Sequence, residues 1–117
     1  MPTSRLRVAR DPALALIVRI FVGSVAERWD VPEGVREDLR LAASEVFSVA
    51  VDAGPGDLMS FELSSENAEL EFRADAVHSE RGQPDDVEGW DGRFDLVRAL
   101  FPDAEIGDTV RIRVPAA

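Results

Sequence analysis

Residues 30–54, DVPEGVREDLRLAASEVFSVAVDAG, decide the fold. Apolar residues recur in this stretch at intervals of three and four, which is typical of a helix with one buried face. They are Val35, Leu39, Ala42, Val46, Val49 and Ala53. Asp30 with Glu33 after it predicts a capping box at the start of the helix. Gly54 predicts its end.

The segment before this helix predicts a strand and a first helix. Leu6 and Val8 alternate with arginines, which is typical of a strand with one buried face. Asp11 followed by Pro12 predicts the start of a helix that runs to about Trp29. Its predicted apolar stripe is Leu14, Ile17, Phe21, Val25 and Trp29. Because nearly all of 13–22 is apolar, this helix is either buried on several sides or also meets a partner.

The segment after the helix predicted within residues 30–54 predicts mostly strands. Two alternating runs, 59–63 and 70–74, flank the turn residues SSEN at 64–67 and predict an antiparallel hairpin. The polar, acid-rich residues 75–92 predict a long loop. Apolar residues within 94–101 predict a short helix.

A short strand at Ile106 and a last strand over 110–114 complete the predicted order. We therefore expect one α+β domain over residues 1–117, a two-layer sandwich with a mostly antiparallel sheet covered on one face by helices. The other face should be polar, with arginines and glutamates paired across strands. These are Arg5, Arg7, Arg111 and Arg113, with Glu62, Glu69 and Glu71.

The composition excludes several kinds of function. The 117 residues include no cysteine, one histidine and no lysine, which excludes thiolate or multi-histidine metal sites and a P-loop lysine. The net charge of −10 argues against nucleic acid as a partner and favours a basic protein, or serves solubility alone. The chain shows neither a membrane-spanning apolar run nor a signal-peptide pattern, so we expect no membrane partner and a cytoplasmic location.

The chain resembles the GHKL (Bergerat-fold) ATPase domain, and is most similar to the small serine kinases that act as anti-sigma factors in bacteria. The resemblance rests on the order of elements, on RLAASEVFSVAV at 40–51 and on FDLVRALFPDAEIGDTVRIRV at 94–114. It implies the histidine-kinase-like ATPase fold and a role in transcription regulation. It also implies a sigma factor or an anti-anti-sigma protein as partner, and a possible homodimer.

The resemblance assigns Glu45 to the family's catalytic glutamate, which helps to activate a water or hydroxyl. The family's Mg²⁺-holding asparagine corresponds to Val49, which has no oxygen to offer, although Mg²⁺ requires oxygen ligands. Ser48 and Asp52 carry oxygens but lie about 100° and about 60° away around the helix. Three interpretations of Glu45 stay open: a helix-surface carboxylate, a vestige of the family site, or a working base.

The nucleotide-binding segments depart from the family pattern as well. Asp75 matches the aspartate that contacts the adenine amino group, or is a plain loop carboxylate. The family's next glycine is Val77 here, and Arg93 stands where a glycine would let the backbone approach the phosphates. The cofactor-binding residues that the resemblance implies are therefore Asp75 and Gly92, both vestigial. We expect no metal ligand and no ATP or Mg²⁺ as cofactor.

Trp90 and Arg93 are the candidate partner-binding residues. A tryptophan in an acidic loop either packs on the domain or anchors a partner. His78, in the same polar loop, is expected to be solvated. The leading hypothesis is a degenerate serine kinase, a pseudokinase, that sequesters a sigma factor or an anti-anti-sigma protein. The alternatives are an active ATP-dependent serine protein kinase and a dimerisation or scaffold subunit without a switching role.

Overall fold

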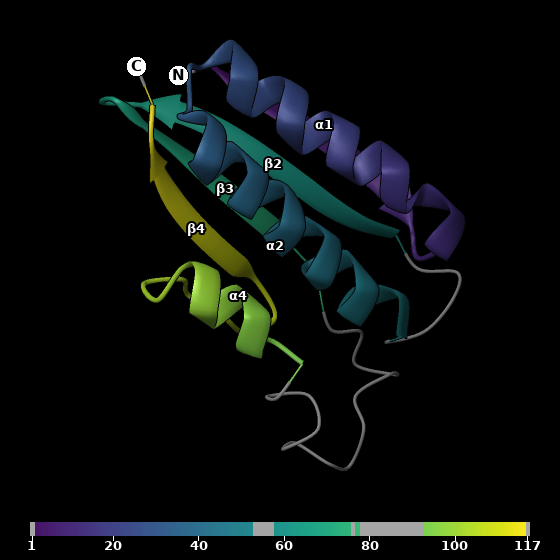
Figure 1. Ribbon diagram of the computed structural model, residues 1–117. Helices are drawn as coiled ribbons and strands as arrows, with labels where there is room; N and C mark the ends of the chain where they lie inside the picture. The colour runs from purple at the N-terminus through teal and green to yellow at the C-terminus, as the bar shows by residue number, and fades with distance from the viewer. Residues whose placement is uncertain (1, 53–57, 76, 78–92, 117) are drawn as a thin grey trace.

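The computed structural model describes residues 2–52, 58–75, 77 and 93–116. Its elements follow one another along the chain in an order close to the one predicted (Figure 1). They are β1 (Thr3–Ala9), the 3-10 helix η1 (Pro12–Leu14), α1 (Ala15–Arg28), α2 (Glu33–Asp52), β2 (Leu58–Glu66), β3 (Glu69–Asp75), α4 (Asp95–Leu100) and β4 (Val110–Pro115).

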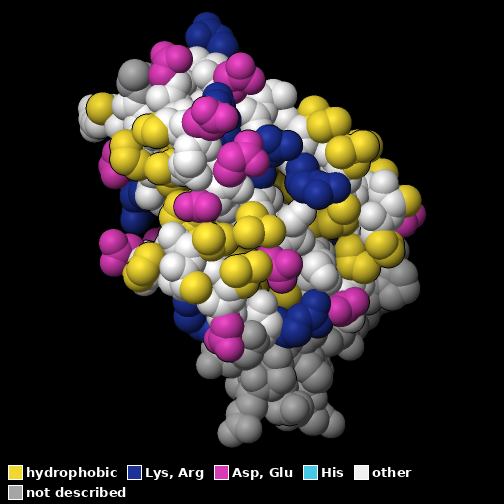
Figure 2. All heavy atoms as spheres, in the orientation of Figure 1, with side chains coloured by type: hydrophobic (Ala, Val, Ile, Leu, Met, Phe, Trp, Pro, Cys, Tyr) yellow, Lys and Arg dark blue, Asp and Glu magenta, His cyan; other side chains and the backbone are white. Residues whose placement is uncertain are grey.

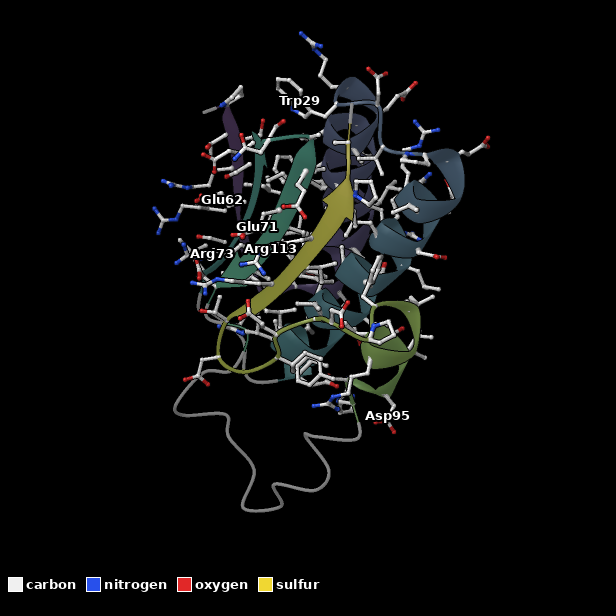
Figure 3. All side chains as sticks on the ribbon, turned by 90° about the vertical axis from the view of Figure 1, so that its left-hand side faces the viewer. Trp29, Glu62, Glu71, Arg73, Asp95 and Arg113 are labelled. Carbon is white, nitrogen blue, oxygen red and sulfur yellow. The ribbon has the colours of Figure 1, made fainter. Side chains whose placement is uncertain are left out.

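The four strands form one antiparallel sheet in the order β1-β2-β3-β4. The helices α1, α2 and α4 lie together on one face of this sheet, so the predicted α+β arrangement of sheet and helices is confirmed (Figures 1 and 3). The predicted strand at Ile106 is wrong, because that segment contributes only an isolated bridge between Glu105 and Arg111.

The hairpin of β2 and β3 is confirmed, with its turn slightly later than predicted. β2 continues through Glu66, and the loop consists of Asn67 and Ala68, whose φ angles are 52° and 63°. Two successive left-handed residues are typical of a type I′ turn, whose twist matches that of the flanking strands. The turn therefore keeps the apolar residues of both strands on the helix-covered face.

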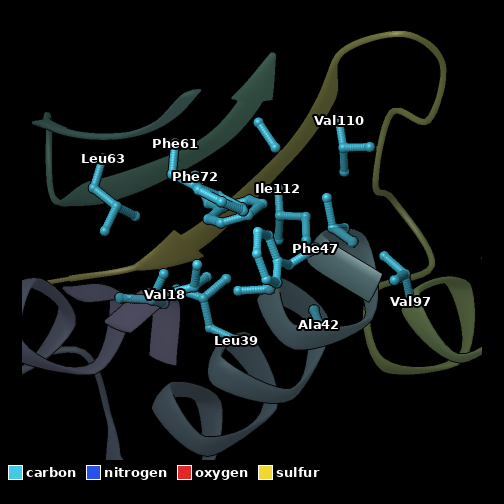
Figure 4. Packing of buried hydrophobic residues seen from close by; sticks show 14 of the residues in the cluster. Val18, Leu39, Ala42, Phe47, Phe61, Leu63, Phe72, Val97, Val110 and Ile112 are labelled. Carbon is cyan, nitrogen blue, oxygen red and sulfur yellow. The ribbon is translucent and has the colours of Figure 1, made fainter. Parts of the chain in front are cut away.

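The core lies between α2 and the sheet, as the periodicity of α2 predicts (Figure 4). Phe61 of β2 is fully buried between two other rings. Its ring centroid lies 6.3 Å from that of Phe47 in α2 and 5.9 Å from that of Phe72 in β3. Tilted aromatic pairs at these distances add favourable ring–ring contact to the burial of apolar area.

The predicted stripe of α1 is wrong at its centre. The fully buried residues of α1 are Val18, Val22 and Ala26, whereas Ile17 is 47% exposed. The other stripe residues are partly buried at the margins of the contact with the core; they are Leu14, Phe21, Val25 and Trp29. Since the first half of α1 is apolar on nearly every side, its periodicity cannot specify which side faces the sheet.

The predicted capping box at Asp30 is also wrong. Asp30 has a φ of 55°, and its backbone N–H donates to the carbonyl of Glu27 over 3.1 Å. The N–H of Val31 donates to the carbonyl of Ala26 over 3.0 Å, which completes a Schellman motif at the end of α1. Asp30 therefore ends one helix and does not begin the next, since α2 starts at Glu33.

The face of the sheet away from the helices is polar, as predicted (Figure 3). Arg5 pairs with Glu62 at 2.9 Å, and Arg113 pairs with Glu71 at 3.2 Å, each across neighbouring strands. Exposed pairs of this kind contribute little to stability. Their main consequence is that one face of the sheet stays solvated while the other holds the core.

Candidate functional site

The second half of α2 carries the residues that the resemblance singled out. Glu45 is half-buried, whereas Ser48 and Asp52 are exposed, and the three lie on neighbouring turns of one side of α2. Arg93, just before α4, places its Nη1 2.7 Å from Asp52 Oδ2, and its Nη2 donates to Ser48 Oγ over 3.4 Å. We call Glu45, Ser48, Asp52 and Arg93 the α2–α4 cluster.

Val49 lies beside this cluster in sequence but inside the core in space. Its side chain is fully buried, so the position to which the resemblance assigns Mg²⁺ binding offers neither a side-chain oxygen nor access to solvent. Asp52, the nearest carboxylate on the next turn, already pairs with Arg93. The residues present therefore do not fit a Mg²⁺–phosphate site at the position that the resemblance implies. Within the described part of the chain, no three acidic, histidine or cysteine side chains are grouped to hold a metal ion.

Asp75 lies at the end of β3, on the open face of the sheet. Its Oδ1 accepts a hydrogen bond from Arg73 Nε over 2.9 Å and another from Thr109 Oγ1 over 3.1 Å. The hydrogen bond to Asp75 and its negative charge raise the pKa of Arg73 above the ordinary value. The structure does not bring Asp75 and Glu45 together, because the sheet separates Asp75 from the helix layer.

The space between α2 and the end of β3 is filled by a buried arginine. Arg10 is 4% exposed, and its Nη1 donates to the carbonyls of Ala50 over 2.9 Å and Val77 over 3.0 Å. Val77 itself is fully buried. Sequence reasoning missed Arg10, which follows directly after β1, although continuing the alternation of Leu6 and Val8 by two residues places it on the buried side.

A small groove lies next to the α2–α4 cluster, between the start of α1 and the end of α2. Its volume is about 230 Å³, and it is lined by Pro12, Ala15, Ser44, Phe47, Ser48, Val51 and Asp52. Pockets for small-molecule ligands usually measure about 300–1,000 Å³. This groove is therefore smaller than a usual cofactor site.

Exposed apolar side chains gather on α1. Leu16 is 59% exposed, Ile17 is 47% exposed and Ile20 is 56% exposed, and spacings of three and four make them neighbours on the helix surface. We call these three residues the α1 apolar surface, and Figure 2 shows hydrophobic side chains gathered over this helix. Its nearest charge in sequence is Arg19, and α1 contains no acidic residue before Glu27. None of the described helices is long and apolar enough to cross a membrane.

The remaining candidates from the sequence, His78, Trp90 and Gly92, lie outside the described residues. Arg93 is described, and its ion pair with Asp52 was not foreseen, since no local pattern links the two residues. Comparison with protein-family models and with curated proteins gave no match for this chain.

Proposed function

We propose that this chain is a protein-binding regulator with a domain of the anti-sigma-factor type. It acts by sequestering a sigma factor or an anti-anti-sigma protein, without Mg-ATP chemistry. The observation that carries this proposal is the α1 apolar surface, with three large aliphatic side chains about half exposed on one helix. Contiguous exposed apolar area of this kind is typical of protein-interaction sites in soluble domains.

The geometry of α2 supports the absence of Mg-ATP chemistry. Val49 is buried in the core, and Arg10 occupies the space between α2 and Val77. Arg93 pairs with Asp52, so a metal ion would have to compete with a guanidinium for this carboxylate. A protein with these contacts can still bind a partner through its surface, because the α1 apolar surface does not depend on them.

The expected result for a variant of the α1 apolar surface is a selective loss of partner binding. Ile20→Glu places a carboxylate in an apolar contact, where an unpaired charge is costly, so affinity should fall at least about tenfold. Binding of the purified full chain to sigma factors and anti-anti-sigma proteins of its source organism, followed by fluorescence anisotropy, measures this. Leu96→Glu on α4, where the leucine is 38% exposed, is the matched control.

Two outcomes of this measurement contradict the proposal. If none of these proteins binds the unchanged chain, sequestration of a sigma factor or its antagonist is not the function. If a partner binds but Ile20→Glu binds it as tightly as the unchanged chain and Leu96→Glu do, then α1 is not the docking surface.

The second candidate function is an ATP-dependent serine kinase, favoured by the half-buried Glu45 beside exposed Ser48 and Asp52. Calorimetric titration with ATP and ADP, with and without Mg²⁺, separates the two candidates. We expect no Mg²⁺-dependent binding. Tight binding that requires Mg²⁺ would replace the proposed function with the kinase.

A further inference from the structure

We propose that the outer edge of β1, together with the neighbouring side of α1, accepts an extended acidic segment of a partner protein as a fifth strand of the sheet. We call this surface the β1 edge site and define it by Arg5 and Arg7 of β1 and by Phe21 of α1. It rests on the proposed function only in that the chain binds proteins, and it adds a second contact of different chemistry beside the α1 apolar surface.

β1 is the more open of the two edge strands. All seven residues of β1 pair with β2 in one continuous register, without a bulge. Since β1 comes first in the strand order, no described strand lies on its other side. The opposite edge, β4, is partly covered by the bridge between Glu105 and Arg111 and ends at Pro115. A regular, uncovered edge strand is a ready template for an added strand.

The side of α1 next to β1 is apolar. A Cβ atom at Gly23 would lie 3.0 Å from Arg40 Cδ, so the Gly23 side of α1 faces α2. At 100° per residue, Phe21 lies about 160° around the helix from Gly23 and about 100° from Val22, the centre of the buried face of α1. Phe21 therefore faces the side of α1 opposite to α2, and α1 is in contact with β1, the edge strand of the sheet. Phe21 is only partly buried, so an added strand could bury its apolar side chains against this ring.

The open face of β1 is basic. Arg5 and Arg7 point to this face, and β1 carries no acidic residue. The Arg5 side chain is 63% exposed even though it pairs with Glu62. Arg7 lies opposite Ser60, and among the described residues no carboxylate pairs with it. Opposite charges in directly facing positions stabilise a strand pair, so the residues of an added strand beside Arg5 and Arg7 should be acidic.

The same charges disfavour a second copy of this chain at the site. A two-fold pairing of β1 with itself centred on Leu6 would set Arg5 of one copy opposite Arg7 of the other. Like charges that face each other directly across strands are destabilising. The added strand that fits best alternates acidic residues, facing the open side, with apolar residues facing α1.

The test uses the full chain and synthetic seven-residue peptides that alternate glutamate and valine. We expect the peptide to shift the backbone amide NMR signals of β1 and of Phe21. A peptide alternating lysine and valine should bind more weakly. Arg7→Glu should weaken binding of the glutamate peptide by about fivefold and strengthen binding of the lysine peptide, because the charge that faces the added strand is reversed. Arg111→Glu, on the open face of the opposite edge strand, is the matched control and should change the binding of neither peptide.

Three outcomes would overturn the inference. The first is equal binding of the glutamate and lysine peptides. The second is that the peptide changes backbone amide NMR signals elsewhere but not those of β1. The third is a dimer of the peptide-free chain whose β1 amides are already protected from exchange, which assigns the edge to a second copy. None of these depends on whether a sigma factor or an anti-anti-sigma protein binds, so this inference and the proposed function can fail separately.

Discussion

Phe61→Ala is expected to lower the free energy of unfolding by about 3–5 kcal/mol, the usual cost of removing a buried phenylalanine ring. Phe61 is fully buried and lies between Phe47 of α2 and Phe72 of β3. Its removal leaves a cavity where the helix layer meets the sheet, and both neighbouring rings lose a partner. Urea denaturation followed by circular dichroism measures the loss.

Leu58→Ala is the control for Phe61→Ala. Leu58 begins the same strand and is 51% exposed, so its truncation should change the free energy of unfolding by no more than about 0.5 kcal/mol. A loss for Phe61→Ala of the same size as for Leu58→Ala would mean that α2 does not pack on the centre of the sheet as described.

Arg10→Ala should lower the free energy of unfolding by about 2–4 kcal/mol, since buried acceptors left without a donor cost about 1–3 kcal/mol each. The Arg10 guanidinium donates to the carbonyls of Ala50 and Val77, which belong to segments far apart in the chain. An alanine cannot reach either carbonyl, and it leaves the space between α2 and the end of β3 empty. Thermal and urea unfolding of the unchanged chain and of Arg10→Ala measure the difference in the free energy of unfolding.

Arg7→Ala is the matched control for Arg10→Ala, because it removes an exposed arginine of β1, three residues before Arg10. Its effect should stay within about 0.5 kcal/mol. If Arg10→Ala were equally mild, water would be able to replace the guanidinium, and the space beside Ala50 would be accessible to a ligand. That result would weaken the argument against a nucleotide in this region.

The strands, the hairpin and the second helix were predictable from the sequence because their patterns are local. Alternation with a period of two specifies which face of a strand is buried, and the hairpin residues Phe61 and Phe72 obey it. The three-and-four spacing in α2 likewise specifies one face, and the structure buries its members from Leu39 to Val49. The buried face is wider than predicted, since it also includes Ala43, Phe47 and Ala50. These patterns hold for α2 and the hairpin because most of their apolar residues lie on one side.

The orientation of α1 and the role of Asp30 were not predictable in this way. α1 has apolar residues on nearly every side, so only its contact with α2 and the sheet decides that Val18 is buried and Ile17 exposed. Asp30 is suited to a cap by its side chain, yet the path of the chain between the two helices requires a left-handed residue there. For α1 the deciding contacts lie outside the local sequence, whereas for Asp30 the backbone hydrogen bonds that end α1 prevail over the capping tendency of the side chain.

For the candidate site too, some properties follow from the sequence and others only from the tertiary structure. The sequence by itself determined the chemistry available: Val49 has no oxygen to offer a metal ion, and Arg93 is a permanent cation. Only the tertiary structure decided that Val49 is in the core, that Asp75 lies on the face of the sheet away from the helices, and that Arg93 reaches Ser48, 45 residues away along the chain. The identity of a side chain sets which bonds it can make, whereas packing between distant segments sets which partners come within reach.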